Sequence, residues 1–203
     1  MPIGLFWSSL GKKKKIITVI KDQKLVQLIK LKTGLVIPQL KISESTRLFG
    51  MMIGIPTRPQ LILSRALYES FDKDEIEYVL MHEVGHYKLS HGVKETTVGV
   101  ILLITGIFIL RQSPNLLLAI VLGVVFGIMV IRVGRIFEYQ ADAYALEKMS
   151  NPQGMITATE KFRNYYGRKY TENKNKLISS LFYVGNPYDN RIKMAKEKLG
   201  RRF

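Results

Sequence analysis

The pattern of apolar and polar residues divides the chain into three stretches. Residues 1–95 mix short apolar runs with charged residues, residues 96–133 are almost continuously apolar, and the remainder returns to a mixed pattern. Between Thr96 and Ile131 the only charged residue is Arg111. This distribution predicts a water-facing body, interrupted by a lipid-facing insert.

Before the insert, the pattern predicts a helix, a small sheet and a second helix. Ile16–Leu31 has apolar residues at three- and four-residue spacing, which predicts an amphipathic helix that ends at Gly34. Asp72 and Glu75 resemble a capping pair at the start of the next helix. Between these helices, prolines separate short apolar runs that predict strands: Leu35–Ile37, Leu48–Ile55 and Leu61–Leu63. The fold class that we predict is mainly α with a small β-sheet (α+β), in one domain over residues 1–203.

The insert, residues 96–133, predicts a helical hairpin. Its two apolar segments, Thr96–Leu110 and Leu116–Val133, are joined by a turn around Pro114. At 1.5 Å per residue the first segment reaches only about 22 Å, against about 30 Å of hydrocarbon, so we expect both helices to continue beyond the apolar limits. The alternative is a buried core hairpin, but each segment is apolar on every face. Gly123 and Gly127 offer a surface for close packing.

Charge and composition favour a membrane over nucleic acid as the partner. The net charge is +15, no nucleic-acid motif is recognisable, and the absence of cysteine excludes disulfides and thiolate metal sites. Arg111 alone marks one end of the hairpin, and by the positive-inside rule the other, more basic end and both soluble parts lie in the cytoplasm. The basic residues at that end are Lys88, Lys94, Arg132 and Arg135.

The N-terminal segment, Met1–Lys15, leaves two interpretations open. Its apolar residues precede its lysines, which is the reverse of the order in a secretory signal. It is therefore either an interfacial membrane anchor or a frayed basic terminus.

The sequence His82-Glu-Val-Gly-His86 is the strongest chemical signal in the chain. On a helix, His82 and His86 lie one turn apart on the same face, so their imidazoles can bind one metal ion, and Glu83 lies beside them as a candidate proton acceptor. All three histidines of the protein lie within residues 81–92. The alternative is a helix that carries surface histidines.

A catalytic zinc site generally needs a third protein ligand. No histidine follows His91, so the third ligand is a carboxylate or His91 itself. Glu138 is the better candidate, because an antiparallel hairpin returns the chain beside the histidines just before this residue. Asp142, one turn later, falls on the same face and could orient a ligand imidazole.

These motifs together resemble the M48 family of membrane metallopeptidases, the group of the HtpX-like proteases. The resemblance covers HExxH, two apolar segments and Glu138-Tyr-Gln-Ala-Asp142, and extends to Ser64-Arg-Ala-Leu67 and to Asn186-Pro-Tyr-Asp-Asn-Arg191. It implies a zincin-like fold with a transmembrane hairpin and one zinc ion per chain, for which the family's ExxxD motif supplies the third ligand. By this match Arg191 becomes a catalytic-site residue.

Two departures from the family pattern affect substrate binding. The family has an Asn-Ala-x-Ala strand before HExxH, where this chain has Phe49-Gly-Met-Met-Ile-Gly-Ile-Pro56. Asn186 stands where the family has histidine, so any role of that imidazole is lost.

The resulting functional hypothesis is a membrane-anchored zinc endopeptidase that cleaves membrane or membrane-proximal proteins, in protein quality control by family analogy. Glu83 would take a proton from water, and strand Leu48–Ile55 or Leu61–Leu63 would pair with an extended substrate. One alternative is an inactive membrane sensor or scaffold that retains the metal site. Another is a basic membrane-surface protein with an accidental HExxH. The substrate and the oligomeric state are not readable from the sequence.

Overall fold

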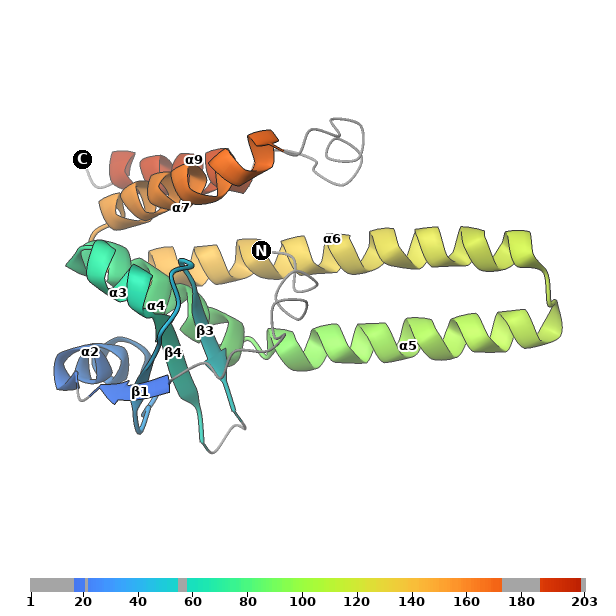
Figure 1. Ribbon diagram of the computed structural model, residues 1–203, viewed down its shortest axis with the longest axis horizontal. Helices are drawn as coiled ribbons and strands as arrows, with labels where there is room; N and C mark the ends of the chain where they lie inside the picture. The colour runs from blue at the N-terminus through green and yellow to red at the C-terminus, as the bar shows by residue number, and fades with distance from the viewer. Residues whose placement is uncertain (1–16, 21, 55–57, 173–186, 202–203) are drawn as a thin grey trace.

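The computed structural model describes residues 17–20, 22–54, 58–172 and 187–201. A small sheet and several helices form a body, from which two long helices project side by side (Figure 1). The prediction of a mainly α fold with a small β-sheet is confirmed. The segment Met1–Lys15 and the substituted position Asn186 lie outside the described residues.

Four strands form the sheet in the order β1-β2-β4-β3. The strands are β1 (Ile17–Ile20), β2 (Leu40–Ser43), β3 (Gly50–Ile53) and β4 (Gln60–Ser64). Strand β2 runs antiparallel to β1 and parallel to β4, and β3 runs antiparallel to β4. Within the part of the chain that the structure describes, β3 therefore has one edge that is not paired with a strand.

The predicted helix over Ile16–Leu31 is wrong in its first part. Ile17–Ile20 forms β1, and helix α2 (Gln23–Thr33) begins only after Asp22, whose side chain caps it. The apolar spacing fits both structures, but a β-branched run favours a strand when a partner such as β2 is available. The predicted stop is confirmed, because Gly34 ends α2 in the left-handed conformation.

The predicted strand Leu35–Ile37 is also wrong, because β2 forms at Leu40–Ser43. Strand β2 pairs on both sides, and Pro38 could not donate to either neighbour. Ile37 is nevertheless buried, so the apolar run marks core residues although it is no strand.

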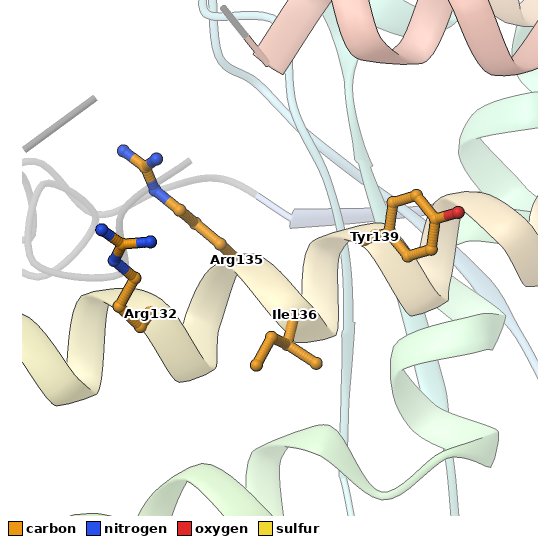
Figure 2. A pocket seen from close by; sticks show the side chains of 4 residues that line it. All are labelled: Arg132, Arg135, Ile136 and Tyr139. Carbon is orange, nitrogen blue, oxygen red and sulfur yellow. The ribbon is translucent and has the colours of Figure 1, made fainter. Parts of the chain in front are cut away.

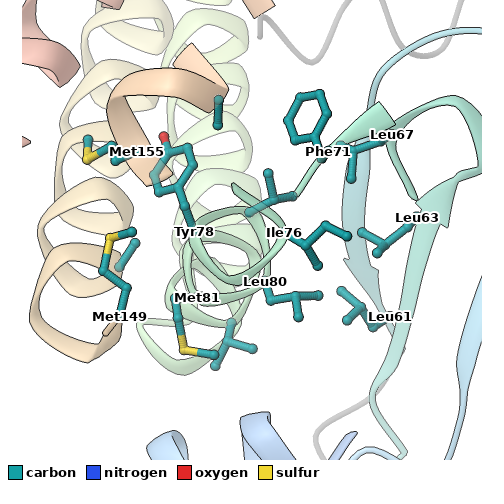
Figure 3. Close-up of a cluster of buried hydrophobic side chains, with 14 of the residues drawn as sticks. Leu61, Leu63, Leu67, Phe71, Ile76, Tyr78, Leu80, Met81, Met149 and Met155 are labelled. Carbon is teal, nitrogen blue, oxygen red and sulfur yellow. The ribbon is translucent and has the colours of Figure 1, made fainter. Parts of the chain in front are cut away.

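Helix α4 (Lys73–Lys88) carries the HExxH sequence and begins as predicted. The backbone N–H of Glu75 donates to Asp72, and the Glu75 carboxylate accepts from the Asp72 N–H. The short helix α3 (Arg65–Ser70) precedes it. The apolar side of α4 packs on β4 and on residues near α7, which makes α4 the centre of the body (Figure 3).

The projecting helices are α5 (His91–Gln112) and α6 (Leu116–Lys148). They have 22 and 33 residues and extend beyond both apolar segments, as expected. In the most apolar window of each helix no residue is buried, and both are long and apolar enough to cross a membrane.

The predicted packing surface of the hairpin is wrong. Among the described residues, no atom outside the helix backbone around them lies within 4 Å of where a Cβ on Gly123 or Gly127 would stand. The helices instead approach at Gly106, where a Cβ would lie 3.2 Å from the ring of Phe126.

Two further helices complete the body. Helices α7 (Gln153–Glu172) and α9 (Pro187–Gly200) lie side by side (Figure 1). Helix α9 also contacts α6. This contact brings α9 to the part of α6 that carries Glu138 and Asp142.

Candidate metal centre

Helices α4 and α6 bring the three predicted metal ligands together. The Nε2 atoms of His82 and His86 lie 3.1 Å apart. One carboxylate oxygen of Glu138 lies 3.6 Å from Nε2 of His82, and the other lies 3.4 Å from Nε2 of His86. Gly85 permits this approach, because even a Cβ there would lie only 3.3 Å from the backbone of Ala141 on α6.

This geometry suits a zinc ion. Zinc bonds of about 2.0–2.1 Å in a tetrahedron place neighbouring ligand atoms about 3.3 Å apart. Two imidazoles and one carboxylate also form a donor set known from catalytic zinc sites, which leaves a fourth position for water or substrate. His82, His86 and Glu138 could therefore hold the ion, each through one atom.

Asp142 lies behind the first ligand. Its Oδ1 is 2.8 Å from Nδ1 of His82, and the hydroxyl of Tyr78 donates to the same oxygen at 2.9 Å. A carboxylate at Nδ1 favours a hydrogen there, which leaves the Nε2 lone pair for a metal. Sequence reasoning missed Tyr78, although its position one turn before His82 was the available signal.

Arg191 comes from α9 and contacts both acidic residues of α6. Its Nη2 donates to Glu138 Oε2 at 2.7 Å, and its Nε donates to Asp142 Oδ2 at 2.7 Å. The guanidinium therefore offsets part of the negative charge of these carboxylates and holds them one helical turn apart. The structure thus brings Arg191, which the family resemblance pointed to, into contact with the predicted ligand Glu138 and with Asp142.

The charged neighbours decide the protonation of both carboxylates, which lie beyond the apolar segment of α6. Burial alone would raise the pKa of Glu138, but hydrogen bonding to His86 and the charges of His82 and Arg191 hold it well below its usual range. Burial also opposes the ionisation of Asp142, yet Arg191 and His82 lower its pKa. Both groups are thus held as anions.

Glu83 lies between the metal ligands and the edge strand β3. Burial raises the pKa of Glu83 to about 7, against an opposing effect of His86. The backbone of Met52 hydrogen-bonds its carboxylate, and a Cβ on Gly50 would lie 3.4 Å from its Cγ. A carboxylate with a pKa near neutrality can both accept and return a proton.

His91 contacts the second ligand from behind. Its Nδ1 lies 3.0 Å from Nδ1 of His86, and its Nε2 lies 3.0 Å from Oε1 of Gln140. The group of possible ligands found among the described residues contains Glu138 and not His91. Sequence reasoning did not predict this contact, because the bend at Ser90 has no signal as strong as glycine or proline.

A shallow groove of about 320 Å³ follows α6 between its apolar segment and the metal centre (Figure 2). It is lined by Arg132, Arg135, Ile136 and Tyr139. Basic and aromatic side chains are typical of the level at which a membrane helix leaves the hydrocarbon. None of these four residues belongs to the proposed ligand set.

Comparisons with known proteins agree with these features. The model of peptidase family M48 matches residues 22–199. The chain is 26% identical over 161 residues to the "Protease HtpX homolog" of Limosilactobacillus reuteri (strain DSM 20016), covering 66% of this chain and 52% of that protein. It is 26% identical over 194 residues to "Protease HtpX" of Histophilus somni (strain 2336), covering 81% and 67%.

Among solved structures, the crystal structure of S. mikatae Ste24p aligns with a TM-score of 0.65 at 20% identity, covering 89% of this chain and 52% of that one. At this identity the likeness shows the fold. The chain spans about half the length (52%) of the L. reuteri relative and of the Ste24p chain.

Proposed function

Because the chain belongs to peptidase family M48, we propose that it is a zinc-dependent endopeptidase anchored in a membrane. The observation that carries the proposal is the convergence of two Nε2 atoms and one carboxylate at zinc-like spacing, with Glu83 beside them. In this proposal His82, His86 and Glu138 hold one zinc ion per chain.

The proposed reaction is hydrolysis of a peptide bond. A bound zinc ion would polarise the scissile carbonyl and lower the pKa of water towards about 7. Glu83 accepts the proton of the attacking water at its carboxylate and passes it to the nitrogen of the leaving amine. The new C–O bond thereby replaces the C–N bond. Asp142 orients His82, and Arg191 holds Asp142 and Glu138 in place.

The edge of β3 is the better of the two candidate substrate strands. Strand β4 pairs with β2 and β3, so Leu61–Leu63 has no open edge in this sheet. Strand β3 (Gly50–Ile53) contacts Glu83, because a Cβ on Gly50 would lie 3.4 Å from its Cγ and the backbone of Met52 hydrogen-bonds its carboxylate. An extended peptide that added to β3 would lie next to the catalytic base, bound through backbone hydrogen bonds without the family's Asn-Ala-x-Ala side chains.

The hairpin supports a substrate near the membrane. Helices α5 and α6 leave the body directly beyond His91 and Glu138, so membrane insertion of the hairpin would bring the centre close to the lipid surface. Basic residues at that end favour a cytoplasmic orientation of the body. We therefore propose membrane or membrane-proximal proteins as substrates and a role in protein quality control, with the hairpin as an insert in one peptidase domain.

The proposal is tested by comparing Glu83→Gln with the parent, both purified in detergent. This variant should bind zinc like the parent and lose cleavage of a quenched casein substrate by about 10²–10⁴-fold, because it keeps the ligands and removes the proton acceptor. Glu147→Gln, at an exposed position of α6, is the matched control and should cleave normally.

Two results would contradict the assignment. Cleavage by Glu83→Gln at the parental rate would exclude Glu83 as the base. A parent that binds zinc stoichiometrically and cleaves nothing, with or without chelator, would favour the inactive sensor or scaffold.

A further inference from the structure

We propose that His91 is a positioning residue of the metal centre: its neutral ring accepts the Nδ1 hydrogen of His86 and so keeps the Nε2 lone pair of His86 directed at the metal. This inference rests on the proposed zinc site. It adds a residue that neither ligates the metal nor touches the substrate.

The direction of the hydrogen bond follows from hydrogen counting. The Nδ1 atoms of His86 and His91 lie 3.0 Å apart, so one hydrogen lies between them. His86 presents Nε2 towards His82 and Glu138, at 3.1 and 3.4 Å. If that nitrogen binds a metal, the hydrogen of the neutral ring must be on Nδ1 of His86, and Nδ1 of His91 must accept it.

Gln140 completes the series of hydrogen bonds that begins at His86. With its Nδ1 accepting, His91 carries its hydrogen on Nε2, which lies 3.0 Å from the side-chain oxygen of Gln140. The amide oxygen can only accept. Each donor in the chain from His86 through His91 to Gln140 therefore meets an acceptor, and the opposite orientation would place hydrogen on the metal-facing nitrogen of His86.

The surroundings hold the His91 ring in this position. The ring stacks on Phe137 with a centroid distance of 4.5 Å and an interplanar angle of 10°, and His91 is only 2% exposed. Such burial favours a neutral imidazole. Phe137 and Gln140 flank Glu138 in sequence, so one segment of α6 supplies both the third ligand and the support of the second.

The backbone bend between α4 and α5 makes the contact possible. On one continuous helix, a residue five positions after His86 would point about 140° away from it. Ser90 adopts φ 55° and ψ 36°, which ends α4 and turns His91 back towards the ligands. His82 is thus supported by a carboxylate and His86 by a neutral ring, so the second support adds no negative charge to the site.

Zinc affinity of the full chain in detergent, measured by competition with a chromophoric chelator, tests the proposal. His91→Phe keeps a ring against Phe137 and removes both nitrogens, so it should bind zinc about 10–100-fold more weakly. His91→Asn retains an acceptor oxygen near the position of Nδ1 and should recover most of the affinity. Tyr139→Phe, on an exposed neighbour, is the control and should bind like the parent.

A second pair of variants leaves the ring in place. Gln140→Glu keeps the acceptor and should preserve the affinity, whereas Gln140→Leu removes it and should weaken binding. Equal affinity of parent and His91→Phe would overturn the proposal, as would equal weakening by His91→Phe and His91→Asn, which indicates packing alone. If His91→Phe does not fold, equal affinity of the two Gln140 variants would overturn it. A parent without zinc affinity would instead refute the proposed metal site.

Discussion

The body and the hairpin place apolar residues in opposite environments. In the body, Leu80 on α4 and Leu63 on β4 are completely buried, whereas Leu103 on α5 remains 63% exposed. Both regions contain apolar side chains, but only the body removes them from solvent by packing them against other parts of the protein. The apolar residues of the hairpin remain exposed, and the length and composition of its helices suit a lipid bilayer.

The two regions also differ in how they treat charge. The body buries acidic residues in pairs, such as Glu77 with Lys32 and Glu75 with Lys161, each at 2.5 Å. The hairpin, by contrast, has Arg111 as its only charged residue between Thr96 and Ile131. The candidate metal centre lies at the junction of the two regions, where paired charges meet the apolar helices. Matched substitutions in the body and in the hairpin test this difference.

We expect the largest effect from Arg191→Met. It leaves Glu138 and Asp142 without their shared cation, and breaking such a buried group typically costs about 3–5 kcal/mol of unfolding free energy. Arg163→Met removes an exposed pair with Asp189 and should cost at most about 1 kcal/mol. Denaturant unfolding of the metal-free protein measures both. If Arg191→Met lost less unfolding free energy than Arg163→Met, the buried network would contribute no net stability.

Acid should remove the same contribution from the metal-free parent. The pKa values of Glu138 and Asp142 are lowered in the folded protein, so their stabilisation is complete above the unfolded values near about 4 and is lost as the pH falls through the lower folded values. Arg191→Met should flatten this part of the stability curve. Unfolding at a series of acidic pH values measures the slope, and an unchanged slope would assign the acid sensitivity to other groups.

The next effect separates the two kinds of apolar residue. Leu80→Ala empties a completely buried position and should cost about 2–5 kcal/mol of unfolding free energy. Leu103→Ala, the same change in the hairpin, should leave the stability of the body nearly unchanged. Chemical unfolding followed by circular dichroism compares the two variants. An equal loss of unfolding free energy in both would mean that the hairpin is part of the soluble core.

The convergence of the candidate metal ligands was largely predictable because it depends on short-range rules. Histidines four apart share a helix face, and a hairpin returns the chain to its start, which together point to Glu138. The capping pair at Asp72 is equally local. Pairing of Arg191 with the carboxylates rests on the packing of α9, so the motif could indicate the residue but not its contacts.

The features that the sequence did not predict depend on residues distant in the sequence or on the backbone conformation of one residue. Ile17–Ile20 becomes a strand because β2 lies beside it, and no local pattern states that. The contact of His91 depends on the left-handed conformation of Ser90, which serine rarely adopts. Such positions are selected by tertiary packing, which a single sequence does not display.

A charged residue introduced into the hairpin tests directly whether the hairpin faces lipid. Val124→Arg places a cation in the second apolar segment, which should cost about 2.5–3.5 kcal/mol of membrane insertion free energy near the bilayer centre. Leu31→Arg, at a highly exposed position of the body, is the control and should insert normally. Partition between membrane and soluble fractions after carbonate extraction measures the effect. Equal extraction of parent and Val124→Arg would contradict a lipid-facing hairpin.

The smallest expected effect compares how α4 and α5 begin. Asp72 caps α4 with a side-chain hydrogen bond of 2.9 Å, whereas Ser90 precedes α5 in the left-handed conformation and makes no side-chain cap. Asp72→Ala should therefore cost about 1 kcal/mol, and Ser90→Ala should change the unfolding free energy little. Ser90→Gly should gain up to about 1 kcal/mol by relieving the backbone. Ser90→Gly could also weaken zinc binding while it stabilises the fold. This result would show that the strained backbone at Ser90 holds His91 against His86. His91 would then link the start of α5 to the metal ligands.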